Sequence, residues 1–158
     1  FYPMQTFSKN RPVDFKSIPC FIEASDSKTL ECIQSLALSV SEKVYMLSSH
    51  DRKYLHLSAV FACNFVNHCY EIAAEILHQH DIPFEVLQSL IDETARKIHM
   101  LSPRDAQTGP AVRYDKNVIE AQLNLLADLP LWQEIYERMS ASIHRTAITN
   151  KPNHYDKL

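Results

Sequence analysis

The chain has 158 residues, of which 46% are hydrophobic, and its 16 basic and 19 acidic side chains give a net charge of −3. This length fits one compact domain, or one domain with part of another, and the absence of a basic block argues against a nucleic-acid-binding protein. Polar residues interrupt the most apolar stretch, Leu55 to Leu77, so it does not reach the length of a membrane span. We expect a soluble protein.

Four cysteines lie in apolar surroundings without a Cys-x-x-Cys pair: Cys20, Cys32, Cys63 and Cys69. This pattern favours reduced thiols in a cytoplasmic protein over a disulfide framework. Eight histidines are present, but His78 and His80 point to different sides of a helix and no His-Glu-x-x-His spacing occurs. The sequence therefore predicts no metal site.

The first part of the chain alternates strand and helix patterns. An apolar run over 18–24 is typical of a buried or edge strand, and Asp26 can cap a helix that reaches about Ser39. Residues 44–47 favour a second strand. Strand, helix and strand form half of an α/β layer, without the Gly-x-Gly-x-x-Gly turn that holds a dinucleotide. We expect the end of a nucleotide-binding domain here.

A long helix is predicted to follow. Ser48 and Asp51 make a weak capping box, and neither Pro nor Gly occurs before about Gln79, which allows a helix of about 30 residues and roughly 45 Å. Its first turn, around Arg52, is typical of a solvated helix start. Apolar residues then cover most of its circumference, so we expect the buried central helix of the domain.

Shorter helices follow. Pro83 suits the first position of a helix with an apolar stripe from Phe84 to Leu101; Asp115 can cap the next helix, and Pro130 can open the last one.

These elements predict a mainly α protein. Residues 1–48 are the remnant of a Rossmann-type α/β sheet, residues 49–149 form an all-α substrate and dimerisation domain around the long helix, and residues 150–158 are a polar tail that we expect to fray. The opening segment 1–7 resembles the interior of a folded protein rather than a start or a signal peptide, so we expect a fragment.

The only glycine, Gly109, lies in the segment 102–115, together with two arginines, a threonine and two prolines. A permissive backbone beside two guanidinium groups is suited to a functional loop. An ordinary connection between two helices is the alternative.

Three polar residues interrupt the apolar part of the long helix: His56, Asn64 and Asn67. Helical spacing places them on one face, where they could line a cleft and bind a ligand. In the alternative interpretation each is satisfied within the core or lies at the surface.

Several strings together resemble one family: 55–68, 83–84, 91–95, 103–106 and 108–115. They are similar to the C-terminal domain of NAD(P)-dependent oxidoreductases that join a Rossmann domain to a helical domain of unknown function, number 2520. In plan that family is similar to pyrroline-5-carboxylate reductase and the 6-phosphogluconate dehydrogenase group. Residues 2–8 also resemble the His-Pro-x-Gln-x-Phe segment late in the family's Rossmann domain, with Tyr2 in place of the common His.

The resemblance implies a homodimer and a cleft for hydride transfer to or from a small anionic substrate. It implies that His56 acts as general acid or as hydrogen-bond partner of the substrate, and that Asn64 orients the substrate. Five further residues are expected to bind the substrate: Asn67, Arg104, Thr108, Gly109 and Arg113. Three residues are expected to contact the cofactor: Pro3, Met4 and Gln5.

NADP or NAD would be bound mainly by a domain absent from this chain, so we expect the chain alone to be inactive. A non-enzymatic helical dimerisation or ligand-sensing module is the alternative function.

Overall fold

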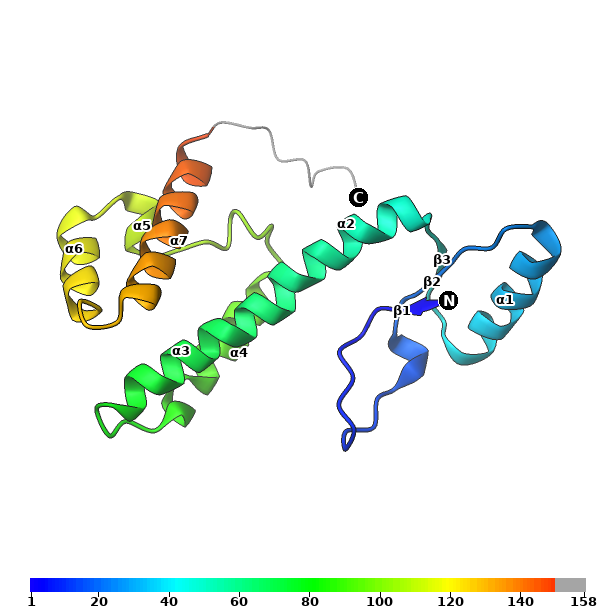
Figure 1. Cartoon of the computed structure of the whole chain (residues 1–158), viewed down its shortest axis with the longest axis horizontal. Coiled ribbons are helices and arrows are strands. Elements are labelled where there is room, and N and C mark those ends of the chain that lie inside the picture. The colour runs from blue at the N-terminus through cyan, green and yellow to red at the C-terminus, as the bar shows by residue number, and fades with distance from the viewer. Residues whose placement is uncertain (150–158) are drawn as a thin grey trace. The chain divides into compact units, whose positions relative to one another are not determined.

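The structure, a computed structural model, describes residues 1–149; the predicted polar tail 150–158 lies outside them. The chain is mainly helical, as predicted, and divides into two compact units, residues 1–69 and 70–158 (Figure 1). The division falls after Cys69, inside a long run of helix. None of the helices in the described part is long and apolar enough to cross a bilayer.

The first unit contains a small mixed sheet, with strands β1 (Tyr2–Pro3), β2 (Cys20–Ile22) and β3 (Val44–Met46) in that order. The central strand β2 is parallel to β3 and antiparallel to β1. Helix α1 (Ser27–Val40) connects the two parallel strands, which confirms the predicted strand, helix and strand.

Local sequence signals explain these boundaries. The Asp26 carboxylate accepts from the backbone N–H of Thr29 at 2.8 Å and so caps α1. The core of the unit is small and apolar, with Ile18, Cys20, Ile22 and Ala37 buried. The buried Ser41 hydroxyl is satisfied there, because it donates to the carbonyl oxygen of Ile18 at 2.6 Å.

The long helix begins and ends close to the predicted residues. It consists of α2 (Ser49–Ala59), a π-helical segment η2 (Val60–Phe65) and α3 (Val66–His78) in direct succession. Ser48 is the N-cap, and its hydroxyl accepts from the backbone N–H of Asp51 at 3.1 Å. The π segment was not predicted, because spacing in the sequence does not reveal an i to i+5 hydrogen-bond pattern.

The prediction that this helix is buried is wrong for the single chain. None of its residues is fully buried, and Leu57, Phe61 and Phe65 expose 53%, 62% and 50% of their surface. The described residues thus leave much of its apolar surface exposed.

The second unit holds η3 (Phe84–Leu87), α4 (Gln88–Lys97), α5 (Pro110–Arg113), α6 (Lys116–Leu125) and α7 (Pro130–Ile148). Helices α5 and α6 both pack against α7 (Figure 1).

The predicted starts of α6 and α7 are confirmed, since Asp115 accepts from the backbone N–H of Val118 and Pro130 is the first residue of its helix. Pro83, in contrast, is the N-cap of a 3-10 turn, with an extended ψ of 138°, rather than the first helical residue.

Candidate functional site

Polar side chains gather where the two parallel strands of the first unit end. In open α/β sheets, ligands bind beyond the carboxyl ends of the strands. Glu23 follows β2 directly, and Ser49 begins α2 shortly after β3. The Ser49 hydroxyl donates to the Glu23 carboxylate, which joins the two strand ends.

Arg52 extends this contact along the first turn of α2. Its Nη2 donates to the Ser49 hydroxyl oxygen at 2.8 Å. The pKa of the Glu23 carboxyl is lowered, chiefly by the hydrogen bond from the Ser49 side chain, then by the backbone of Ser49 and by the charge of Arg52. Glu23 is therefore held as a carboxylate.

Tyr2 and His56 complete the group. Pairing of β1 with β2 places Tyr2 opposite Phe21, near the end of β2. The Tyr2 hydroxyl lies 3.1 Å from Nδ1 of His56, and the guanidinium carbon of Arg52 lies 6.0 Å from the centre of the Tyr2 ring. We call Tyr2, Glu23, Ser49, Arg52 and His56 the edge cluster.

Sequence reasoning identified only His56 in the edge cluster. Arg52 was interpreted as part of a solvated helix start, and Tyr2 only as a substitution in a motif. Glu23 lies near the end of the predicted strand 18–24, and Ser49 follows the predicted strand 44–47 by two residues; these positions were the signal that could have found them.

The predicted cofactor residues lie beside Tyr2. Pro3 pairs with Cys20 in the sheet, and the backbone N–H of Met4 donates to the carbonyl of Pro19 at 2.8 Å. Gln5 is exposed, and its side-chain oxygen accepts from the backbone N–H of Thr6 at 2.8 Å.

Asn64 and Asn67 are exposed, as is His56, although the apolar pattern around them favours burial; the structure agrees with the alternative that they lie at the surface. Asn64 lies within η2, where the π-helical backbone departs from the 3.6 residues per turn on which a common face depends. In the part of the chain that is described, no hydrogen bond joins His56 to either asparagine, whereas one joins it to Tyr2.

In the second unit, Gly109 is the N-cap of α5 with φ 107° and ψ 177°, a conformation essentially restricted to glycine. Thr108 before it is exposed, and its carbonyl accepts from Nε2 of Gln107 at 3.1 Å. Arg113 ends α5 and is exposed, and among residues 1–149 it forms no ion pair with Asp115.

Arg104 has a defined partner within the unit. Its Nη2 donates to the carbonyl oxygens of Thr146 and Thr149, in and just after the last turn of α7. Carbonyls at a helix C-terminus lack intrahelical donors, and a guanidinium there also interacts favourably with the helix dipole. Arg104 thus caps α7.

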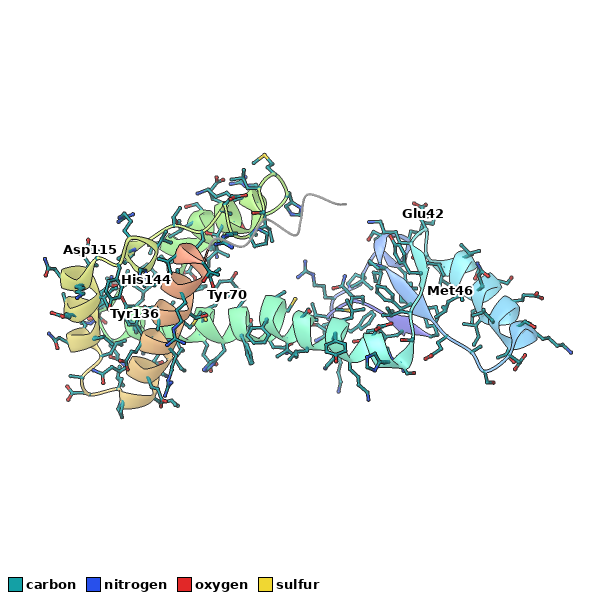
Figure 2. All side chains as sticks on the ribbon, turned by 90° about the horizontal axis from the view of Figure 1, so that it is seen from above. Glu42, Met46, Tyr70, Asp115, Tyr136 and His144 are labelled. Atoms are coloured by element: carbon teal, nitrogen blue, oxygen red, sulfur yellow. The ribbon has the colours of Figure 1, made fainter. Side chains whose placement is uncertain are left out.

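A hollow of about 320 Å³ lies along α6 and α7 of the same unit. Its polar lining includes Tyr114, Lys116, Glu120, Glu137 and Ser140. Figure 2 labels Asp115 at the start of α6, and Tyr136 and His144 on α7. None of the residues predicted for the site lines this hollow. No group of three histidine, cysteine or acidic side chains within residues 1–149 could hold a metal ion.

Two solved structures are similar to this chain. The first is the crystal structure of "putative NADP oxidoreductase BF3122" from Bacteroides fragilis, with 56% identity and a TM-score of 0.89 over 92% of this chain and 56% of that one. The second is protein TM1727 from Thermotoga maritima, with 22% identity and a TM-score of 0.70 over 84% of this chain and 54% of that one, which shows the fold alone.

The chain therefore spans little more than half the length of either protein. No curated protein matches it. The family described as "Domain of unknown function (DUF2520)" matches residues 18–143, most of the sequence. The chain belongs to the DUF2520 family.

Proposed function

We propose that this chain is the C-terminal part of an NADP-dependent oxidoreductase that acts on a small anionic substrate. The observation that carries the proposal is the Tyr2 to His56 contact at the carboxyl edge of a parallel strand pair. The name of the Bacteroides fragilis protein, which is 56% identical, supports the choice of activity and of NADP over NAD.

In this proposal His56 donates the proton that the substrate oxygen requires. Reduction of a carbonyl group requires a hydride at carbon and a proton at oxygen, and a bound nicotinamide supplies the hydride. His56 is exposed, and Nδ1 already contacts Tyr2, so Nε2 is the ring nitrogen that would face the substrate oxygen. Asn64 and Asn67 would orient the substrate through their amides.

The residues of this chain fit only the nicotinamide end of the cofactor. The chain contains one glycine, so the glycine-rich turn that cradles the phosphates would lie in another part of the protein. Pro3, Met4 and Gln5 continue from Tyr2, and the exposed amide of Gln5 suits a carboxamide such as that of nicotinamide.

We propose that Arg113 binds the anionic group of the substrate, with the Thr108 and Gly109 backbone alongside it. Its guanidinium is exposed and can form a bidentate contact with a carboxylate or phosphate. Arg104 supports this region by capping α7, since α5 packs against α7.

We also propose that two copies of the chain associate through the long helix. Tyr54, Leu57, Phe61 and Phe65 are at least half exposed along α2 and η2, and the rings of Phe61 and Phe65 contact each other with centroids 4.9 Å apart. An apolar row of this kind marks an association surface.

The test is an assay of NADPH oxidation by the full-length protein with a panel of small oxo acids and phosphorylated carbonyl compounds. His56→Ala should lower kcat by about a hundredfold or more and leave the Kd for NADPH unchanged, whereas His80→Ala, at another exposed histidine, should not affect turnover. Failure of the full-length protein to bind NADPH, or full turnover by His56→Ala, would overturn the proposal.

A further inference from the structure

The edge cluster fixes both partners of one hydrogen bond. The Tyr2 backbone is held by pairing with β2, and its ring lies beside the guanidinium of Arg52. Arg52 in turn donates to Ser49, which donates to Glu23. His56 lies one turn after Arg52 on α2 and directs Nδ1 to the Tyr2 hydroxyl. The contact thus joins residues 54 positions apart in the sequence.

The chemistry of the two groups decides which of them donates. A phenol is a strong donor, and the unprotonated nitrogen of a neutral imidazole is a strong acceptor. The positive charge of Arg52 beside the Tyr2 ring favours the phenol as donor over the phenol as acceptor.

We propose that Tyr2 is a positioning residue that donates its hydroxyl proton to Nδ1 and holds His56 as the neutral tautomer with the proton on Nε2. Nε2–H is then the group that faces the substrate. This inference rests on the proposed function only in giving Nε2–H a substrate oxygen to act on.

The proton transfers balance without formation of an imidazolium ion. When hydride reaches the carbonyl carbon, the oxygen takes the proton from Nε2, while Nδ1 takes the proton of Tyr2. The products are the alcohol, His56 with its proton on Nδ1, and a Tyr2 phenolate beside Arg52. Water then protonates Nε2, and the proton on Nδ1 returns to the Tyr2 phenolate, which restores the starting tautomer.

The test is nuclear magnetic resonance of the ¹⁵N-labelled 158-residue chain, which reports the protonation of each ring nitrogen. We expect Nδ1 of His56 in the unprotonated range and Nε2 in the protonated range. Tyr2→Phe keeps the ring and the strand, and should shift the Nδ1 resonance and admit the other tautomer. Tyr45→Phe removes an exposed hydroxyl from β3 and should leave His56 unchanged.

A proton on Nδ1 in the unmodified chain, or His56 resonances unaffected by Tyr2→Phe, would overturn the inference. In the full-length enzyme, Tyr2→Phe should lower kcat by about tenfold or more with KM within about twofold, and unchanged kcat would also count against it. Failure of the proposed function looks different, because a protein without hydride transfer could still show the His56 tautomer and its dependence on Tyr2.

Discussion

The ring of Tyr114 stacks on the imidazole of His144, with centroids 4.3 Å apart and planes inclined by 22°. Tyr114 directly follows α5 and has a left-handed backbone with φ 54°, which is uncommon for an aromatic residue. The Lys116 ammonium lies 5.3 Å from the centre of the same ring. The stack on His144 holds the end of the 102–115 segment on α7.

Removal of the stacked ring should therefore destabilise the second unit. We expect Tyr114→Ala to lower the free energy of unfolding by about 1–2 kcal/mol, because a stacked aromatic pair contributes about 0.5–1.5 kcal/mol beyond its buried area. Tyr114→Phe keeps the stack and should stay within about 0.5 kcal/mol. Urea denaturation measures both. Equal stability of the alanine variant and the unmodified chain would show that the ring does not hold the segment.

We expect glycine to be required at position 109 because of its backbone conformation, and not because a side chain would collide with neighbouring atoms. Its φ of 107° and ψ of 177° are strained for any L residue, while an added Cβ would meet no atom within 4 Å. Gly109→Ala should therefore cost about 1–3 kcal/mol of stability. Thr108→Ala, at the neighbouring exposed side chain, is the control and should have little effect in the same denaturation experiment. A Gly109→Ala variant as stable as the control would contradict the backbone requirement.

Local signals in the sequence predicted most element boundaries. Asp26, Ser48 and Asp115 each cap a helix because an N-cap depends on the oxygen of one side chain and on backbone N–H groups two or three residues ahead. Pro130 opens α7 for a similarly local reason. Such features depend on a few consecutive residues and can be read without knowledge of the fold.

Features that depend on distant residues were missed. Strand β1 is only two residues long, and it is a strand because Tyr2 pairs with Phe21. The contacts of Tyr2 with Arg52 and His56 likewise depend on how β1 and α2 meet, which spacing along the chain does not encode. Burial of the long helix was overestimated. An apolar pattern shows that a helix surface favours burial, but it does not show whether residues of the same chain cover that surface.

The lowered pKa of Glu23 predicts an acid-dependent loss of stability. A carboxyl whose pKa is lower in the folded state contributes stability above its unfolded pKa, near the ordinary value of 4.5, and loses it as the pH falls through the folded pKa. Between these two values the unfolded chain binds more protons, so stability rises with pH. Glu23→Gln should make the melting temperature less dependent on pH below about 5.

Glu31→Gln is the matched control for this experiment, because it removes the same charge from an exposed position on α1. Melting curves from pH 6 to pH 3, about the range that spans carboxyl titration, should separate the two variants. A Glu23→Gln variant with the same pH dependence as the unmodified chain would show that the Ser49 hydrogen bond does not stabilise the folded state.

The proposed dimer can be tested at one side chain of the long helix. Light scattering should give twice the 18.2 kDa of a single chain at micromolar concentration. Phe61→Glu places a charge in the apolar row and should yield a monomer, since an unpaired charge in an interface is costly. Leu125→Glu changes an apolar residue on α6 that is 82% exposed and should leave the mass unchanged. A single-chain mass for the unmodified protein would rule out the dimer.

Arg104 and Arg113 should separate into a structural and a substrate-binding role. Arg104 donates to the last carbonyls of α7, so Arg104→Met should lower the free energy of unfolding by about 1–2 kcal/mol, the range of a partly exposed charge-assisted contact. In the full-length enzyme its kcat/KM should change little at temperatures where the variant is folded.

Arg113→Met should behave in the opposite way. Loss of a charge-assisted, bidentate contact worth about 1.5–3 kcal/mol corresponds to a loss of about ten- to hundredfold in kcat/KM. The exposed Arg113 side chain forms no ion pair among residues 1–149, so stability should stay within about 0.5 kcal/mol. Unchanged kcat/KM for Arg113→Met would show that Arg113 does not bind the substrate, and the Gly109 segment would then be a connection between helices. A loss of kcat/KM in Arg104→Met without a loss of stability would show that Arg104 binds the anionic group instead.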